Sequence, residues 1–282
     1  MLSVNELEDR LIDLAFAEDI GDGDHTTLCC IPEDETGKSH LLIKEDGILA
    51  GVEIAEKTFA RFDPTLQVEV LIHDGSPVKV GDIAMIVTGK TRSLLQTERL
   101  MLNIMQRMSG IATMTHKYVE RIEGTKAHVL DTRKTTPGMR IMEKAAVKIG
   151  GGMNHRIGLF DMILLKDNHV DFAGGIAKAI DRCHRYLKEN GLDLKIEIEV
   201  RNFDELNQVL LHGGVDRIML DNFSVPDTKK AVDLIKGSYE TESSGGITYD
   251  TIRDFAEQGV DFISVGALTH SVKCLDMSFK AC

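Results

Sequence analysis

The sequence lacks several residue types that define common protein classes. It has no tryptophan and only 5% aromatic residues, so a surface for stacking nucleic-acid bases is not expected. It has five cysteines, an odd number with no C-x-x-C pair, which argues against a disulfide framework and against a zinc site. These cysteines are Cys29, Cys30, Cys183, Cys274 and Cys282. We expect free thiols and a cytoplasmic location.

Long apolar runs and nucleotide-binding motifs are also absent. No run reaches the ~20 apolar residues of a membrane helix, and the acidic, amphipathic N-terminus resembles neither a signal nor a transit peptide. No G-x-G-x-x-G follows an expected strand, which disfavours a Rossmann dinucleotide site, and the lack of G-x-x-x-x-G-K-S/T excludes a P-loop. A net charge of -12 without a basic stripe makes nucleic acid an unexpected partner.

One segment of this acidic chain is cationic. Residues 131–169 carry seven Lys or Arg against four acids. The seven are Arg133, Lys134, Arg140, Lys144, Lys148, Arg156 and Lys166. Such a local cluster is typical of a site for a small anionic substrate.

The spacing of apolar residues predicts two kinds of structure along the 282 residues. Before residue 92 the pattern is mixed: a helix opened by a Ser3–Glu6 capping box, then short strands with a helix over 53–62. A helical period follows over 92–122, with a break or a kink expected at Ser109-Gly110. After residue 125, strands and helices alternate, which predicts βα units and a parallel sheet. The strands are expected at 128–131, 161–165, 194–200, 216–220, 238–242 and 260–265.

Polar residues at the end of each of these six strands favour a barrel over an open sheet, because barrels of βα units carry their active sites at the strand C-termini. The first two strands end in Arg133 and Lys134, and in Lys166 and His169. His155 and Arg156, after a triple glycine, should join the same rim. Several cations converging on one cleft suit a ligand with more than one carboxylate or phosphate.

Acids and glycines end the remaining strands. Glu197 and Glu199 alternate with aliphatic residues, so both should face the lumen and need cationic partners. Glu199 and Asp221 could hold sugar hydroxyls or a magnesium ion carried by a polyphosphate. The last two strand ends indicate a phosphate site. Its residues are Ser244, Gly245, Gly246, Gly266 and Ala267, with His270 nearby.

Taken together, these motifs resemble the quinolinate phosphoribosyltransferase family over nearly the whole chain. The matching segments are 18–27, 97–99, 102–112, 131–138 (DTRKTTPG), 150–156 (GGGMNHR), 166–169 (KDNH), 197–199, 220–223, 244–246 and 264–270. His25 departs from the family, which more often has an aliphatic residue there, and it lies outside the expected site.

The resemblance implies a pentosyltransferase of NAD biosynthesis. It would join quinolinate and phosphoribosyl pyrophosphate to give nicotinate mononucleotide, pyrophosphate and CO2, with Mg²⁺ as cofactor. The implied fold is an N-terminal α/β sandwich domain (1–112, joined by the tail 271–282) plus an open, TIM-like α/β barrel (113–270). The implied unit is a homodimer, sometimes assembled further, in which the partner's N-terminal domain completes each site.

The family's site also maps onto this chain residue by residue. Quinolinate would be bound by Arg99 of the partner chain, Thr132, Arg133, His155, Arg156 and Lys166. Lys134 would stabilise the leaving pyrophosphate and Lys166 would take part in catalysis. Glu199, preferred over Glu197, and Asp221 would serve the ribose or Mg²⁺. The 5-phosphate would lie against Ser244, Gly245, Gly246, Gly266, Ala267 and His270.

Three other functions remain open at this point. A lysine at a barrel strand end, such as Lys166, could form a Schiff base in a lyase. A phosphoribosyltransferase-like relative, such as the molybdenum-transport-associated proteins, could act on a different acid. A non-catalytic binding protein is disfavoured by the density of charge at the strand ends.

Overall fold

The computed structural model describes residues 3–282, and these form two compact units. The first contains the residues up to 116, together with 135–151 and 268–282; the second contains 117–134 and 152–267. The expected domain limits, 1–112 and 113–270, stay a prediction, because compactness does not show which segments fold together. Among the described residues, none of the helices has the length and apolar character needed to cross a membrane.

The first unit is built on a four-stranded antiparallel sheet of order β12-β1-β5-β3. The strands are β1 (Thr36–Ile43), β3 (Gln67–Val70), β5 (Ile83–Lys90) and β12 (Met277–Ala281), beside a small pair of β2 (Gly47–Ile48) and β4 (Pro77–Val78). The helices are α1 (Val4–Ile20), α2 (His25–Cys30), α3 (Val52–Phe62), α5 (Arg140–Ile149) and α4 (Thr91–Arg121), whose last turn belongs to the second unit.

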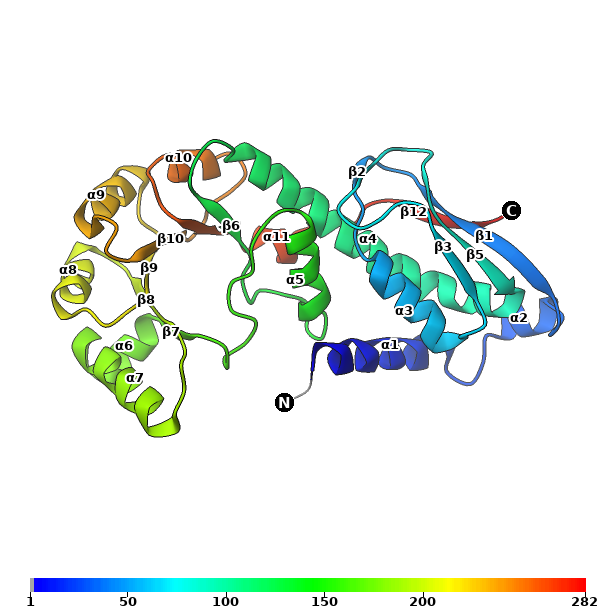
Figure 1. Ribbon diagram of the computed structural model, residues 1–282, viewed down its shortest axis with the longest axis horizontal. Coiled ribbons are helices and arrows are strands. Elements are labelled where there is room, and N and C mark those ends of the chain that lie inside the picture. Colours follow the sequence, from blue (N-terminus) through cyan, green and yellow to red (C-terminus); the bar gives the residue numbers. More distant parts are fainter. Residues whose placement is uncertain (1–2) are drawn as a thin grey trace. The chain divides into compact units, whose positions relative to one another are not determined.

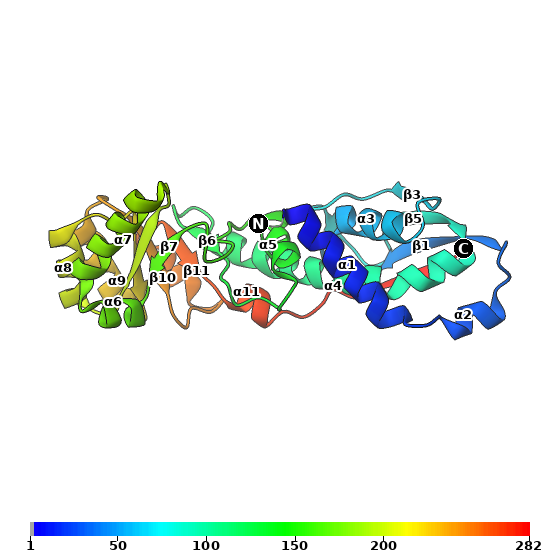
Figure 2. The ribbon, with the colours of Figure 1, turned by 90° about the horizontal axis from the view of Figure 1, so that it is seen from below.

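Helices α3 and α4 pack on this sheet through one apolar core, as both views show (Figure 1, Figure 2). Phe59 of α3 and Met101 and Met105 of α4 are fully buried against Leu41 and Met85 of the strands. This is the expected α/β layering. The capping box of α1 is confirmed, since the Ser3 hydroxyl accepts from the Glu6 N–H and the Glu6 carboxylate accepts from the Ser3 N–H.

Of the break or kink expected at Ser109-Gly110, the break is wrong, because α4 runs without interruption from Thr91 to Arg121, and the kink stays a prediction. Gly110 serves close packing instead: a Cβ there would lie 2.3 Å from the Lys273 carbonyl oxygen. The Ser109 hydroxyl accepts from the Ala50 N–H at 2.8 Å and lies 3.1 Å from the Ala50 carbonyl oxygen. Gly110 therefore allows the segment at Lys273 to pack closely against α4, and Ser109 connects the segment at Ala50 to α4 by hydrogen bonds.

The second unit is a six-stranded, all-parallel sheet of order β6-β11-β10-β9-β8-β7. The strands are β6 (His128–Leu130), β7 (Ile163–Leu165), β8 (Ile196–Val200), β9 (Arg217–Asp221), β10 (Glu240–Ser244) and β11 (Phe262–Ser264). The helices are α6 (Asp167–Ala173), α7 (Ile176–Asn190), α8 (Phe203–His212), α9 (Val225–Ile235), α10 (Ile252–Ala256) and α11 (Ala267–His270).

All six expected strands are present, and β6 and β7 are the edge strands of the sheet, with one isolated parallel bridge, Leu130–Met153, beside β6. The sheet curves with α7, α8 and α9 along its outer side (Figure 1). Ile196, Ile198 and Val200 of β8 pack in the apolar layer shared with those helices. This confirms an open α/β barrel, with the alternate residues Glu197 and Glu199 on the opposite face of β8.

Candidate active site

The predicted site residues of the second unit gather at the C-terminal ends of its parallel strands. Thr132, Arg133 and Lys134 follow β6, and Lys166 follows β7. Glu199 lies in β8, while Asp221 and Ser244 are the last residues of β9 and β10 and are register partners. His155 and Arg156 lie in the loop before β7. Because parallel strands end at the same edge, the sequence prediction that these residues share a rim agrees with the topology.

Arg133 and Arg156 are near enough on this rim for the charge of Arg133 to act on Arg156. Arg133 is exposed and Arg156 is partly buried, and neither lies within ion-pair distance of an acid in residues 3–282. Burial, and next the charge of Arg133, lower the pKa of Arg156 from its ordinary value. Within the described residues 3–282, the Arg156 guanidinium donates to the Met162 carbonyl, at 3.2 Å. The charges of Glu197 and Asp161 oppose this pKa shift without cancelling it. The two guanidiniums repel each other, so the arrangement favours an anionic ligand.

Glu199, Asp221 and Lys166 form a second group of charges. The Lys166 ammonium lies 3.5 Å from a Glu199 oxygen, and the Glu199 side chain is 10% exposed. Burial raises the pKa of Glu199, the Lys166 charge opposes this, and the Asp221 charge adds to it. Glu199 and Asp221 therefore lie near each other, and such a pair of carboxylates can accept hydrogen bonds from sugar hydroxyls or bind a hard cation.

The glycine turn after β10 has the backbone geometry that only glycine tolerates well. Gly245 has φ +100° and Gly246 has φ +63°, and a Cβ on Gly245 would lie 2.2 Å from the Asn222 side-chain oxygen. The Asn222 N–H donates to the Ser244 carbonyl at 2.8 Å. Gly266 and Ala267 follow β11, which pairs with β10. Both glycine segments therefore leave adjacent strands, as a phosphate site would require.

Two predicted site residues belong to the first unit. Arg99 is exposed on α4 and forms no ion pair with an acid among residues 3–282. His270 is exposed at the end of α11, where its Nδ1 lies 2.7 Å from the Ser271 hydroxyl. The part of both residues in the site stays a prediction.

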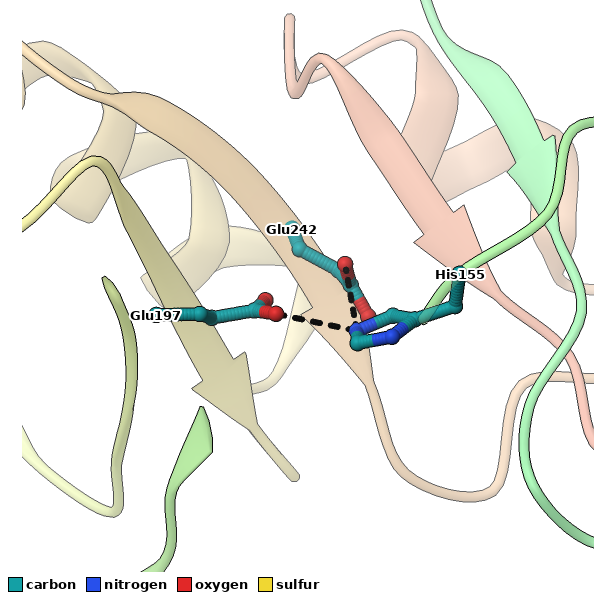
Figure 3. Close-up of side chains that lie close together, drawn as sticks. All are labelled: His155, Glu197 and Glu242. Carbon is teal, nitrogen blue, oxygen red and sulfur yellow. Dashed lines mark ion pairs between the residues drawn. The ribbon is translucent and has the colours of Figure 1, made fainter. Parts of the chain in front are cut away.

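The sequence pattern did not indicate that His155, Glu197 and Glu242 lie together, as Figure 3 shows them. His155 Nε2 lies 2.9 Å from Glu197 Oε2 and 3.7 Å from Glu242 Oε2, and both glutamates are fully buried. Arg217 Nη1 lies 3.1 Å from Glu242 Oε2. The available signal was the alternation of Glu240 and Glu242 in β10, which repeats that of the two glutamates in β8.

Burial dominates the electrostatics of this cluster. It raises the pKa of Glu197 to about 7 and, together with the charge of Glu197, that of Glu242 to about 8. Arg217 opposes the shift at both glutamates. Near neutral pH these carboxyl groups are therefore partly protonated, which reduces the cost of burying them side by side.

The comparisons with known proteins agree with the site. Residues 24–109 match the model of the quinolinate phosphoribosyl transferase N-terminal domain, and residues 111–280 match that of its C-terminal domain. Quinolinate phosphoribosyltransferase (decarboxylating) 1b of Nicotiana tabacum is 47% identical, covering 96% of this chain and 81% of its own. The probable nicotinate-nucleotide pyrophosphorylase (carboxylating) of Bacillus subtilis is 39% identical, covering 95% of this chain and 91% of its own.

A solved structure is also similar over the whole length. The nicotinate-nucleotide pyrophosphorylase from Francisella tularensis has a TM-score of 0.92 and 40% identity, and the match covers 100% of this chain and 98% of that one. Both domain models, the curated relatives and this structure lead to one conclusion. The chain belongs to the quinolinate phosphoribosyltransferase family.

Proposed function

We propose that this protein transfers the phosphoribosyl group of phosphoribosyl pyrophosphate to quinolinate and decarboxylates the product to nicotinate mononucleotide. The observation that carries the proposal is the approach of Arg133 and Arg156 at the strand ends that also hold Glu199 and Asp221. Quinolinate has carboxylates on adjacent ring carbons, and two guanidiniums with Lys166 match that paired negative charge. Thr132 adds a hydroxyl beside them.

The first step is displacement at the ribose. The pyridine nitrogen attacks the anomeric carbon, the bond to pyrophosphate breaks, and the pyrophosphate takes both electrons of that bond. Lys134, exposed after β6, stabilises the charge that grows on the leaving group. Glu199 and Asp221 accept from the ribose hydroxyls and stabilise positive charge at the ribose carbon, while Ser244 and the glycine turns hold the 5-phosphate.

The second step is loss of CO2 from the carbon next to the ring nitrogen. The nitrogen is quaternary after the transfer, so it accepts the electron pair that the departing carboxylate leaves on that carbon. A proton then replaces CO2 and gives nicotinate mononucleotide. The reaction needs no other electron sink.

The residues present fit a magnesium ion. Glu199 and Asp221 offer carboxylate oxygens near enough for the Asp221 charge to raise the pKa of Glu199, and Mg²⁺ in phosphate-transfer sites is typically held by one or two carboxylates plus substrate phosphates. When bound, the ion neutralises charge on the pyrophosphate. Lys166 already lies beside Glu199, so Asp221 is the more available of the two ligands.

We further propose a homodimer, or a larger assembly of dimers, in which Arg99 reaches the partner's site. The support is that Arg99 is exposed and has no acidic partner among residues 3–282. A cytoplasmic location is supported by five unpaired cysteines, whereas several plant relatives carry names that place them in chloroplasts or mitochondria.

A mass-spectrometric assay tests the function directly. Purified protein is incubated with phosphoribosyl pyrophosphate, Mg²⁺ and either quinolinate or nicotinate. We expect nicotinate mononucleotide from quinolinate alone, because the second carboxylate is needed for binding. No product from either acid would contradict the proposal and direct attention to a relative with another acid substrate.

The Schiff-base alternative has little support from the geometry. Lys166 is about half exposed and forms an ion pair with Glu199, whereas lysines that form Schiff bases are activated by desolvation or by a neighbouring cation. Borohydride reduction in the presence of a carbonyl substrate checks this, since an adduct on Lys166 would contradict the transferase function.

A further inference from the structure

Asn222 connects two parts of the candidate site that come from neighbouring strands. It follows Asp221, the last residue of β9, and Asp221 is the register partner of Ser244 at the end of β10. The two strands lie side by side in the parallel sheet (Figure 1). Asp221 is the candidate for the ribose or Mg²⁺, and Ser244 begins the glycine turn proposed for the 5-phosphate. Asn222 therefore lies where the two ends of one phosphoribosyl group would be bound.

The backbone of Asn222 has a conformation that residues with a side chain rarely adopt. Its φ is +56°, and among residues 3–282 the other non-glycine residue with a positive φ is Lys236, at +51°. Asparagine tolerates this left-handed region better than most residues, whereas glycine adopts it without strain. Residues held in this region cluster at functional sites. Glycine would serve the turn alone, so a further role of Asn222 has to lie in its side chain.

One end of the Asn222 side chain is bound to Asp221. Asn222 Nδ2 donates to Asp221 Oδ2 at 2.8 Å. An ionised carboxylate only accepts hydrogen bonds, so this contact fixes the orientation of the amide. The bond in turn limits the rotation of the Asp221 carboxylate.

The other end of the Asn222 side chain packs against the glycine turn. A Cβ built on Gly245 would lie 2.2 Å from Asn222 Oδ1 and 2.9 Å from the Asn222 main-chain nitrogen. That nitrogen donates to the Ser244 carbonyl at 2.8 Å. Because Gly245 has no Cβ, the turn passes directly over the amide. Asn222 thus contacts the turn with its main chain and its side chain, and contacts Asp221 with the same side chain.

We propose that Asn222 is a positioning residue, which holds the Asp221 carboxylate and the turn at 244–246 at the spacing that one phosphoribosyl group requires. This inference rests on the proposed function, in which Asp221 serves the ribose or Mg²⁺ and the turn holds the 5-phosphate. Asn222 acts through these two groups and does not contact the reacting atoms.

Replacing Asn222 with glycine or with alanine separates the side chain from the backbone conformation. Both variants remove the amide, but only alanine places a Cβ in the left-handed region. We expect both to lower kcat/KM for phosphoribosyl pyrophosphate by about 10- to 100-fold, the usual effect of losing a partner that orients a ligating carboxylate. Asn222→Ala should lower Tm more than Asn222→Gly does. A wild-type kcat/KM in Asn222→Gly would overturn the inference, because the backbone conformation alone would then be sufficient.

Lys236 offers the matched control. It shares the positive φ of Asn222, but it is exposed at the C-terminal end of α9. Lys236→Gly and Lys236→Ala should differ from each other in Tm and keep the wild-type kcat/KM. A loss of kcat/KM in the Lys236 variants equal to that in the Asn222 variants would overturn the inference, because it would trace the effect to general destabilisation.

Calorimetric titration of each substrate alone does not depend on turnover. Phosphoribosyl pyrophosphate should bind Asn222→Gly about 10-fold or more weakly than wild type, with Mg²⁺ and also after its removal by a chelator, because the turn acts on the 5-phosphate without the ion. Quinolinate should bind both proteins equally. Unchanged affinity for phosphoribosyl pyrophosphate, or equal losses for both ligands, would overturn the inference. If Asn222→Gly does not fold, Asn222→Asp serves the same titrations, since it keeps the size of the side chain but has no donor when ionised.

These results also separate the inference from the proposed function. If wild type converts quinolinate and Asn222→Gly equals it, the function stands and the positioning role fails. If wild type does not convert quinolinate but Asn222→Gly still binds phosphoribosyl pyrophosphate more weakly, the proposed acid substrate is wrong and the positioning role stands.

Discussion

Replacing Arg133 with alanine should change ligand affinity and stability in opposite directions. In the free protein the charge of Arg133 opposes that of Arg156, which is reflected in the lowered pKa of Arg156. With quinolinate bound, the same two charges face two carboxylates. Arg133→Ala therefore removes a favourable contact from the complex and an unfavourable one from the free protein.

The size of the change in quinolinate affinity follows from the charged contact that is lost, and the size of the change in Tm follows from the solvent exposure of the two arginines. Loss of a hydrogen bond to a charged group costs about 1.5–3 kcal/mol, which corresponds to roughly a 10- to 150-fold weaker binding of quinolinate. Arg133 is exposed and Arg156 is only partly buried, so solvent screens their repulsion to a few tenths of a kcal/mol. That gain should raise Tm by about 1 °C or less.

Isothermal titration calorimetry of quinolinate and of phosphoribosyl pyrophosphate, each alone, measures the first effect, and differential scanning calorimetry measures the second. Arg182→Ala, which removes an exposed arginine of α7 far from the strand ends, is the control for the change in net charge. Equal weakening of both ligands would refute the assignment of Arg133 to quinolinate. A clear drop in Tm would show that Arg133 supports the fold, contrary to the repulsion argument.

Three further predictions concern the partner chain, the phosphate turn and pH. Arg99→Ala should be inactive alone but regain activity when mixed with Lys166→Ala, because a hybrid dimer contains one intact site; no recovery in dimers proven to exchange subunits would exclude a shared site. Gly245→Ala should raise the KM for phosphoribosyl pyrophosphate and lower Tm more than Gly237→Ala, which shares the positive φ but has open space around its Cβ; equal Tm losses would mean that the Asn222 contact is unimportant. Burial raises the pKa of Glu242 to about 8, so between pH 4.5 and about 8 the folded protein keeps a proton that the unfolded chain has released. The free energy of unfolding should therefore fall as the pH rises from 4.5 to about 8. Urea titrations should show a smaller fall for Glu242→Gln than for wild type.

The parts of the fold that depend on local pattern were predictable. Each of the six parallel strands lies within two residues of its predicted position at one end or both, because apolar runs flanked by polar strand ends recur at every βα unit. The break expected at Ser109-Gly110 failed for a tertiary reason. Glycine lowers helix propensity, but here the missing Cβ admits the Lys273 carbonyl, and that packing outweighs the local cost.

The candidate site also has residues that the local sequence could predict and residues that only the tertiary structure brings together. Arg133, Lys166 and Asp221 could be predicted as candidates because each stands at or just after a strand end, which is a position along the chain. The Glu242–His155–Arg217 cluster was missed, because its members come from three separate segments and its chemistry arises only from burial. A sequence pattern indicates that a glutamate faces the lumen, but not whether a histidine lies opposite it.

The cluster also explains how a chain with net charge -12 can present a cationic rim. The exposed ends of β6 and β7 carry Arg133, Lys134 and Lys166, while two of the glutamates of β8 and β10 are fully buried. Because burial raises the pKa of Glu197 and Glu242, these acids do not exert two full negative charges on the rim near neutral pH. The rim thus keeps its attraction for an anion. Net charge alone would have predicted the opposite sign for this surface.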